Sequence, residues 1–419
     1  MTDTTGRLDV YFGDELVGTI HDTSPLAFEY AASWLDRADA MAVAAIPLRA
    51  SRNDLAAVQA FFENLLPEGE LRQYIAERHK ASTLFSMLRE VAGDTAGGFV
   101  ILPGGQAPQP ATYEATTWKA LATALGKKSA SAIDIHGGGA RISLAGAQDK
   151  TSIAIFDDGV PRLPMGTSPS THILKPDIKR LAKVWESAAN ETIVMLTAAR
   201  CGLPTAEVFY QRQTRSCIVR RFDRIARADG SLGRLVQYDL CQLAGTVSEK
   251  KYEKEGGPGI AQCTELIRRY STQPAVDLRH FVAWIFFNLY VGNNDSHAKN
   301  LSLYRGPGQG VGLTPFYDLM CTRLYPGLSQ EFAFAIGGET KPGAVTREHM
   351  PQLARQLGMG LQFVLKVAGD TAERIPAALT LATEDVARTL PPGGNALADR
   401  LCRFVMSNTK RIAARLLTP

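Results

Sequence analysis

The strongest constraint on the fold is an apolar segment in the second half of the chain. Between Val276 and Val291 the sequence has few polar breaks, and Gly292 follows directly. A helix that is apolar on all sides is stable when it is buried, and glycine commonly ends a helix. The sequence therefore predicts a helix inside a large core. Its apolar stretch from Phe281 to Phe287 is too short to span a bilayer.

The composition indicates an ordinary soluble protein. The 419 residues are 45% hydrophobic and 21% charged, which excludes a disordered chain, a collagen-like repeat and a coiled-coil rod. The length suggests two or three domains or one large bilobal enzyme. The formal net charge of +4 neither requires nor excludes an anionic partner. Scattered cysteines, the absence of a zinc spacing and the absence of a signal peptide predict reduced thiols and a cytoplasmic protein without membrane association.

The sequence suggests three regions. The segment from Pro103 to Pro110 mixes turn-forming residues without an apolar period, which is typical of a linker. We therefore expect a small N-terminal domain at residues 1–107. Residues 108–224 follow as a region of strands with one inserted helix, and residues 225–419 as a mostly helical region.

Local patterns predict several individual elements. The turn Gly13-Asp14 lies between two alternating runs and indicates a hairpin. A helix over Leu55–Leu66 is expected to be capped by Asp54, and a second one over Lys179–Arg200 to end near Gly202. Further predictions are a helix at residues 68–79, strands at 152–156 and 171–176, a strand pair around 213–215, and a hairpin from 301 to 314.

The segment VGNNDSHAKNLSLY carries the strongest chemical signal. Asp295 and Asn300 lie five positions apart directly after the apolar helix, and Asp318 in PFYDLM comes 18 residues after Asn300. An acid, an amide and a second acid in this order suit phosphoryl transfer. The first acid orients or deprotonates the attacking hydroxyl, and the other two residues hold Mg²⁺. For the loop taken alone, turn and capping residues are an equal alternative, which Asp318 makes less attractive.

Candidate nucleotide-binding residues lie upstream. The small residues of ISLAGAQDK would let backbone N–H groups approach phosphates, although no Walker A motif occurs. Lys175 ends a predicted strand and could pair with phosphates, while Glu191 on the following helix could hold that lysine in place. The order of these residues matches that of protein kinases.

Together these motifs resemble the HipA family of serine/threonine kinases, the toxin half of HipBA toxin–antitoxin pairs. The resemblance covers almost the whole chain and rests on six motifs, namely FFENLLPEG, ISLAGAQDK, ILKP, RRFDR, NNDSHAKN and PFYD. It implies an α+β, bilobal protein-kinase-like fold with a small N-terminal α/β subdomain and a mostly helical C-terminal lobe. Neither HRD nor DFG is present, and the hinge begins with Arg220 where an acidic residue is expected.

The resemblance also implies roles for individual residues. Asp295 would be the catalytic base, and Asn300 and Asp318 would hold Mg²⁺. Ser143 would be an autophosphorylation site, and the negative charge of its phosphate would repel ATP from the adjacent loop. The residues implied to bind ATP are Ala145, Gly146, Ala147, Gln148, Asp149, Lys150, Lys175, Arg220, Arg221, Phe222, His297, Lys299, Asn300, Tyr317 and Asp318.

The family further implies partners. These are a HipB-like helix-turn-helix antitoxin, operator DNA reached indirectly through that antitoxin, and an aminoacyl-tRNA synthetase as substrate, most often the glutamyl enzyme. Phosphorylation of the synthetase would arrest growth and cause persistence. The basic positions of the last helix could touch DNA, although a solvated helix face is the favoured interpretation; these are Arg400, Arg403, Lys410, Arg411 and Arg415. Two alternatives stay open: a small-molecule kinase, and a co-repressor without kinase activity.

Overall fold

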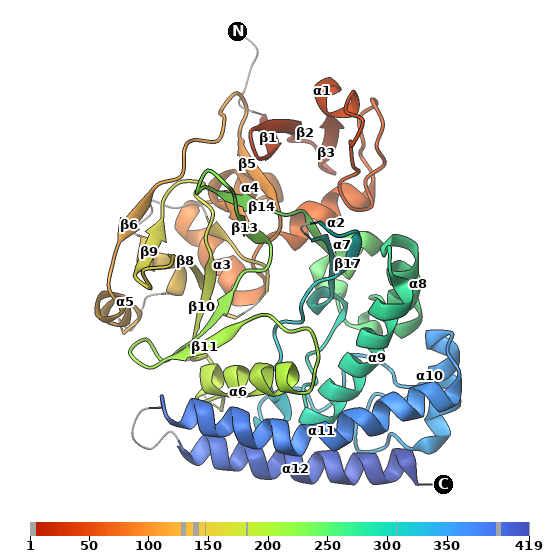
Figure 1. The fold of residues 1–419 in the computed structure, drawn as a ribbon. Helices are drawn as coiled ribbons and strands as arrows, with labels where there is room; N and C mark the ends of the chain where they lie inside the picture. Colours follow the sequence, from red (N-terminus) through yellow and green to blue (C-terminus); the bar gives the residue numbers. More distant parts are fainter. Residues whose placement is uncertain are drawn as a thin grey trace. The chain divides into compact units, whose positions relative to one another are not determined.

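The computed structural model describes residues 6–126, 131–136, 142–146, 148–181, 183–306, 308–390 and 395–418 (Figure 1). The chain forms two compact units, each built from two segments of the sequence. The first unit comprises Met1–Leu174 and Arg221–Glu249, and the second comprises Lys175–Arg220 and Lys250–Pro419. Both contain helices and strands, so the predicted α+β class is confirmed. The predicted three-region division stays a prediction.

The first unit contains most of the strands. Its helical elements are α1 (Ala32–Leu35), α2 (Ala56–Asn64), α3 (Gly69–His79), α4 (Leu84–Val91), α5 (Trp118–Leu125), η1 (Ala132–His136) and α7 (Leu240–Ala244). Its strands are β1 (Arg7–Phe12), β2 (Glu15–His21), β3 (Ala27–Tyr30), β4 (Asp94–Thr95), β5 (Phe99–Pro103), β6 (Tyr113–Ala115), β7 (Ile142–Ser143), β8 (Thr151–Ile155), β9 (Pro161–Pro164), β10 (His172–Pro176, which runs into the second unit), β13 (Arg224–Ala226), β14 (Leu232–Arg234) and β15 (Gln237–Asp239).

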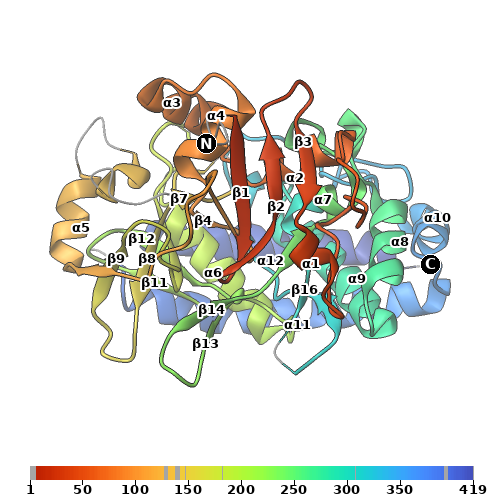
Figure 2. The ribbon, with the colours of Figure 1, turned by 90° about the horizontal axis from the view of Figure 1, so that it is seen from above.

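The N-terminal sheet follows directly from the sequence pattern. Strands β1 and β2 form the predicted hairpin, and Gly13 supplies the positive φ of +61° at its turn. The antiparallel sheet has the order β3-β2-β1-β5, and Figure 2 shows β1, β2 and β3 as neighbours. Phe61 and Phe62 on α2 pack against Phe99 and Phe28 of this sheet. The predicted helix is therefore present, because its aromatic residues cover the sheet.

The predicted cap of α2 is wrong. The residue directly before the helix is Leu55, and no side chain caps that end. Asp54 lies one residue too early for its carboxylate to accept from the first free amides of a helix beginning at Ala56.

The second unit is mainly helical. Its helical elements are α6 (Ser187–Arg200), η3 (Glu253–Glu255), α8 (Ile260–Tyr270), α9 (Pro274–Val291), η4 (Ala298–Asn300), η5 (Thr322–Leu324), η6 (Arg347–His349), α10 (Met350–Leu357), α11 (Leu361–Ala387) and α12 (Asn395–Leu417). Its strands are β11 (Val208–Gln211), β12 (Ser216–Arg220), β16 (Ser302–Arg305) and β17 (Val311–Leu313), while the short turn η2 (Ser248–Lys250) lies at the division between the units.

The predicted central helix is confirmed as α9. Pro274 occupies its first turn, and Gly292 ends it at a φ of +78°. The buried Trp284 on this helix contacts the rings of Phe281, Phe316 and Phe334. Helices α6, α9 and α12 all pack on α11, and Figure 1 shows α11 and α12 side by side. Among the described residues, no helix combines the length and apolarity needed to cross a membrane.

The helix predicted from Lys179 begins eight residues later, at Ser187. Asp177 accepts a hydrogen bond from the backbone N–H of Ala188, while the Ser187 hydroxyl accepts one from Ile178. These bonds hold the preceding segment as a loop, so the apolar spacing there does not produce a helix. All six cysteines carry free thiols, as predicted.

Candidate active site

A buried ion cluster lies in the second unit. The ammonium of Lys175, at the end of β10, is 2.6 Å from Glu191 Oε1 on α6 and also contacts Asp318 Oδ1. The side chains of Lys175 and Glu191 are 4% and 2% exposed, whereas that of Asp318 is 32% exposed. The predicted contact between Lys175 and Glu191 is thus confirmed. Asp318 is partly exposed to solvent, whereas Glu191 is buried. Asp318 is therefore the acid that can contact another cation in place of the Lys175 ammonium.

The charge of Lys175 is fixed by this cluster. Burial favours the neutral amine, but the carboxylates of Asp318 and Glu191 outweigh this effect and hold the pKa of Lys175 above its ordinary value. Lys175 therefore stays protonated at physiological pH. A cation of this kind can contact an anionic phosphate whenever Asp318 turns away from it.

The backbone of Asp318 adopts a conformation that is uncommon for a residue with a side chain. Its φ is +55°, in the left-handed region. Its carbonyl accepts a hydrogen bond of 3.4 Å from the Nδ2 atom of Asn293. Such conformations concentrate at functional sites, where the surrounding structure maintains them.

The segment after α9 joins Asp295 and Asn300 by a hydrogen bond. Asn300 Nδ2 donates to the carbonyl of Asp295 at 3.1 Å, so its amide oxygen is left as an acceptor. Asn293 bonds from Nδ2 to Asn288 Oδ1 on α9 at 2.8 Å and accepts from the N–H of Asp295 at 3.3 Å. Through Asn293, the turn that carries Asp295 is therefore hydrogen-bonded both to the end of α9 and to the backbone of Asp318.

The carboxylate of Asp295 is accessible and has one close partner. Its side chain is 56% exposed. Oδ1 accepts a hydrogen bond of 2.5 Å from the hydroxyl of Tyr252, and His297 Nε2 lies 3.9 Å from the same oxygen. Exposure of this kind allows a hydroxyl-bearing molecule to reach the carboxylate.

The other predicted residues of this segment make structural contacts. Lys299 is 6% exposed, and its carbonyl accepts a 3.2 Å hydrogen bond from Tyr317, whose hydroxyl also bonds Ser302 Oγ at 2.8 Å. The buried His297 ring packs edge-on against the Tyr252 ring, with centroids 5.2 Å apart. Their predicted contact with ATP stays a prediction.

Sequence reasoning missed two residues of this site. Asn293 lies in the NNDSHAKN motif, and its place as a polar residue directly after the helix-ending Gly292 is a usable signal for its role. Tyr252 had no such signal, because it lies 43 positions before Asp295 in a charged segment.

The donor set fits Mg²⁺ and a polyphosphate. Asn300 and Asp318 offer amide and carboxylate oxygens, and two protein ligands suffice for Mg²⁺ when phosphates and water complete its shell. Among the described residues, no group of three or more His, Cys, Asp or Glu side chains could hold a metal ion alone.

The predicted phosphate loop lies in the first unit. Lys150 Nζ donates to the carbonyl of Ala145 at 2.6 Å, and Gly146 has a φ of +105°. A Cβ atom at Gly146 would lie 2.9 Å from that ammonium. The N–H of Glu68 holds the Gly146 carbonyl at 3.1 Å, and Gln148 Nε2 is buried without a hydrogen-bond partner in the described part of the chain. Small residues, a lysine and a spare buried donor suit an anion.

Asp149 and Ser143, in and beside this loop, contact other segments of the first unit. Asp149 accepts from the hydroxyl of Ser131 at 2.5 Å and from the N–H of Ala132 at 2.9 Å, so its carboxylate anchors the loop to η1. The backbone of Ser143 pairs in parallel with Thr95. Ala147 lies outside the described residues.

The predicted hinge residues also hold structural positions. The N–H of Arg220 donates to Glu207 at 2.8 Å, and that of Arg221 donates to Thr171 at 2.9 Å. The buried guanidinium of Arg221 contacts Asp94 and Asp223. Phe222 is half-buried. These contacts lie within the respective units, and the predicted contact of this segment with adenine stays a prediction.

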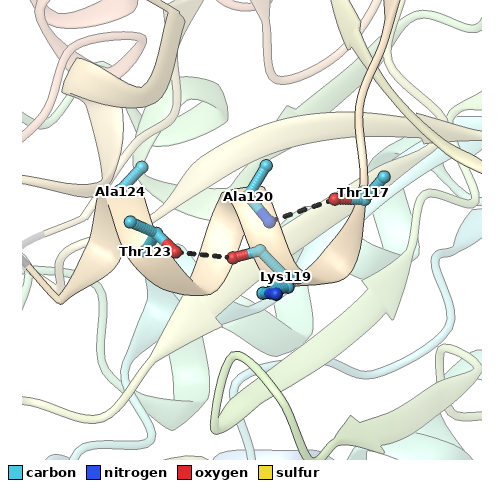
Figure 3. Close-up of a pocket in the computed structure, with 5 residues that line it drawn as sticks. All are labelled: Thr117, Lys119, Ala120, Thr123 and Ala124. Carbon is cyan, nitrogen blue, oxygen red and sulfur yellow. Dashed lines mark hydrogen bonds between the residues drawn. The ribbon is translucent and has the colours of Figure 1, made fainter.

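A small pocket on α5 is a weaker candidate (Figure 3). Its lining residues are Thr117, Lys119, Ala120, Thr123 and Ala124. The Thr117 hydroxyl accepts from Ala120 N at 3.1 Å, and Thr123 donates to the Lys119 carbonyl at 2.9 Å. With one charged group and neither an acid nor an amide side chain, this pocket lacks the chemistry of phosphoryl transfer.

Comparison with known proteins agrees with this geometry. A family model described as the HipA-like C-terminal domain matches residues 142–379, and one described as the HipA N-terminal domain matches residues 8–102. The chain is 34% identical to the "Putative kinase Y4mE" of Sinorhizobium fredii, over 90% of this chain and 92% of that protein. It is 27% identical to the serine/threonine-protein kinase toxin HipA of Shewanella oneidensis, over 93% and 91%. A solved complex of HipA, HipB and operator DNA from Shewanella oneidensis MR-1 contains a chain that matches with a TM-score of 0.80 and 26% identity, covering 98% of this chain and 96% of that one.

Proposed function

The chain belongs to the HipA family of protein kinases, and from this premise we propose that it is the serine/threonine-protein kinase toxin of a type II toxin–antitoxin system. The observation that carries the proposal is the buried contact of Lys175 with both Glu191 and Asp318. A lysine held between a helix glutamate and a partly exposed aspartate is the arrangement that kinases use to position phosphates and metal.

Asp295 would act as the general base. Its exposed carboxylate can accept the proton of a serine hydroxyl as that oxygen attacks phosphorus. The hydrogen bonds of Asn293 and Asn300 to the backbone of Asp295 hold that backbone in place on the turn. These residues thereby orient the acceptor for in-line attack.

The remaining residues would hold the nucleotide and the metal. ATP, when bound, supplies the γ-phosphoryl group. Asn300 and Asp318 would ligate Mg²⁺ through oxygen atoms, which releases Lys175 to contact phosphate while Glu191 keeps its ammonium in place. Gly146, Gln148 and Lys150 would approach the phosphates from the loop, and Arg220, Arg221 and Phe222 would meet adenine through their backbone.

Substitution of the base tests the proposal. We expect Asp295→Asn to lower transfer of labelled phosphate from ATP to lysate proteins by roughly a hundredfold or more. Asp370→Asn is the matched control, since Asp370 lies on α11 and pairs with Lys366. Label that appears in metabolites rather than in proteins would indicate a small-molecule kinase. Growth arrest retained by Asp295→Asn would indicate a co-repressor instead.

We further propose that a HipB-like antitoxin neutralises the chain and that an aminoacyl-tRNA synthetase, most often the glutamyl enzyme, is its target. The solved Shewanella complex, which contains HipB and operator DNA, supports the antitoxin partner and an indirect approach to DNA. Phosphorylation of the synthetase would block aminoacylation and cause growth arrest and persistence. A phosphoproteome recorded after induction of the wild type and of Asp295→Asn tests the target. A synthetase equally phosphorylated in both would contradict this part of the proposal.

Autophosphorylation of Ser143 would switch the kinase off. A phosphate at Ser143 adds roughly −1.5 to −2 charges two residues before Ala145 of the phosphate loop. This charge would repel ATP and compete for the same backbone donors. We expect the phosphorylated chain to lose ATP binding in a calorimetric titration and Ser143→Ala to keep it. Equal ATP affinity of the phosphorylated and unphosphorylated chains would contradict this mechanism.

A further inference from the structure

We propose that Tyr252 is a positioning residue for the base Asp295, an inference that rests on the proposed kinase function. Its hydroxyl donates a 2.5 Å hydrogen bond to Oδ1 of Asp295. The bond joins a segment before α8 to the turn after α9, so it does not follow from local chain geometry.

The segment that carries Tyr252 is anchored independently of Asp295. The carbonyl of Tyr252 accepts hydrogen bonds from the N–H groups of Glu255 and Gly257, both at 3.0 Å. Glu253 Oε2 accepts a 2.7 Å bond from the N–H of Ala335, and Lys254 pairs with Glu331 at 3.3 Å. The backbone that carries Tyr252 is therefore held by contacts that do not involve Asp295.

The ring of Tyr252 is also held. The His297 ring packs edge-on against it at an interplanar angle of 77°, and the ammonium of Lys251 lies 5.4 Å from the ring centroid. Both contacts favour the ring orientation that directs the hydroxyl toward Asp295. Edge packing and a cation over the ring act on the phenyl group, so a phenylalanine at this position would keep them.

This arrangement divides the carboxylate of Asp295 between two tasks. An aspartate side chain that is 56% exposed samples several rotamers unless a partner fixes it. Tyr252 fixes Oδ1, and Oδ2 then faces the incoming hydroxyl whose proton it accepts. Loss of the phenolic hydrogen bond would lower the fraction of base in the productive orientation without removing the base.

The test is a double-mutant cycle with full-length protein, measuring transfer of labelled phosphate from MgATP to lysate proteins. We expect Tyr252→Phe to lower kcat about tenfold and to leave the KM for ATP within about twofold, because the nucleotide contacts are unchanged. In the Asp295→Asn background the same substitution should change the residual rate by less than about twofold. Tyr270→Phe on α8 is the matched control, since its hydroxyl has no hydrogen bond among the described residues.

Each outcome decides the inference. Transfer by the wild type together with an undiminished kcat in Tyr252→Phe overturns it, and an increased rate would show that the hydroxyl instead blocks the acceptor position. An equal loss in the wild-type and Asp295→Asn backgrounds would show a general structural role and also overturn it. Absence of transfer by the wild type would instead contradict the proposed function itself.

Discussion

At the scale of single residues, the buried charge of Lys175 dominates the site. Glu191 is as inaccessible as the lysine, so each depends on the other for compensation of its charge. Removal of one partner from a buried ion pair costs more than removal of both, because the remaining charge has neither water nor a counter-ion.

This asymmetry predicts the stability of two variants. Lys175→Met should lower the free energy of unfolding by about 3 kcal/mol, because it leaves Glu191 buried without its ammonium. The double variant Lys175→Met/Glu191→Leu should recover most of this loss while remaining inactive. Urea denaturation followed by circular dichroism measures both. A single variant as stable as the wild type would show that water reaches Glu191.

The residues of the site differ in how well sequence could predict them. The contact of Lys175 with Glu191 could be predicted because a strand lysine and a helix glutamate follow one another in the order found in kinases, whereas the contact of Lys175 with Asp318 was not predicted. Tyr252 could not be predicted, since no local pattern indicates which distant hydroxyl reaches Asp295. The carboxylate of Asp149 accepts hydrogen bonds from Ser131 and Ala132, while the predicted place of this loop at the phosphates stays a prediction. No local sequence pattern indicates these partners of Asp149.

At the scale of elements, the N-terminal motif FFENLLPEG contacts the predicted phosphate loop. Glu68, near the end of that motif, donates its N–H to the Gly146 carbonyl. Glu63 in the same motif accepts hydrogen bonds from the N–H and the hydroxyl of Ser248 at 2.8 and 2.6 Å. The motif therefore connects two distant segments of the first unit.

The loop conformation predicts an effect on nucleotide binding. Gly146→Ala places a Cβ 2.9 Å from Lys150 Nζ at a φ of +105°, so the lysine or the loop has to move. We expect ATP affinity, measured by calorimetry, to fall about tenfold or more. Gly166→Ala is the matched control, because its φ is +57° and nothing lies within 4 Å of the added Cβ. Equal affinities in the two variants would contradict the assignment of this loop to phosphate.

Helix positions were predicted better than their first residues. The apolar period of α9 and its glycine stop coincide with the observed helix because packing and termination agree there. In α6 the apolar spacing extends into a loop, and the bonds of Asp177 and Ser187 decide the start. Side-chain to backbone bonds of this kind depend on a few polar atoms, and an apolar pattern contains no information about them.

At the scale of the whole molecule, each unit is assembled from separated segments. In the first unit, Asp94 accepts hydrogen bonds from Arg221 at 3.2 Å and from Arg224 at 2.8 Å, and Asp223 accepts one from Gly97 at 2.8 Å. Burial raises the pKa of Asp94, but the guanidinium groups outweigh this and hold it below its ordinary value. These hydrogen bonds join residues more than 120 positions apart, so the charged residues Arg221, Asp223 and Arg224 connect the two segments of this unit.

Stability of the first unit should depend on pH through His136. Burial lowers the pKa of His136 to about 4 from 6.5, although Ser152, whose carbonyl lies 3.0 Å from Nε2, and the charge of Asp94 oppose this shift. In the unfolded chain His136 therefore binds a proton below pH 6.5, whereas in the folded chain it binds one only near pH 4. The contribution of neutral His136 is fully present above pH 6.5. It is lost as pH falls toward 4, by up to about 3 kcal/mol.

Comparison with a variant isolates this contribution from those of the carboxylates. We expect His136→Gln, which keeps a donor for the Ser152 carbonyl, to be less stable than the wild type at pH 7 and to approach it as pH falls to 4. The difference between the two unfolding free energies, measured in urea at several pH values, should shrink across that interval. Asp94 is present in both proteins, so its own titration cancels in the difference between them. A difference that stays constant from pH 7 to pH 4 would mean that His136 binds its proton with the same pKa in the folded and unfolded chains, which would contradict this prediction.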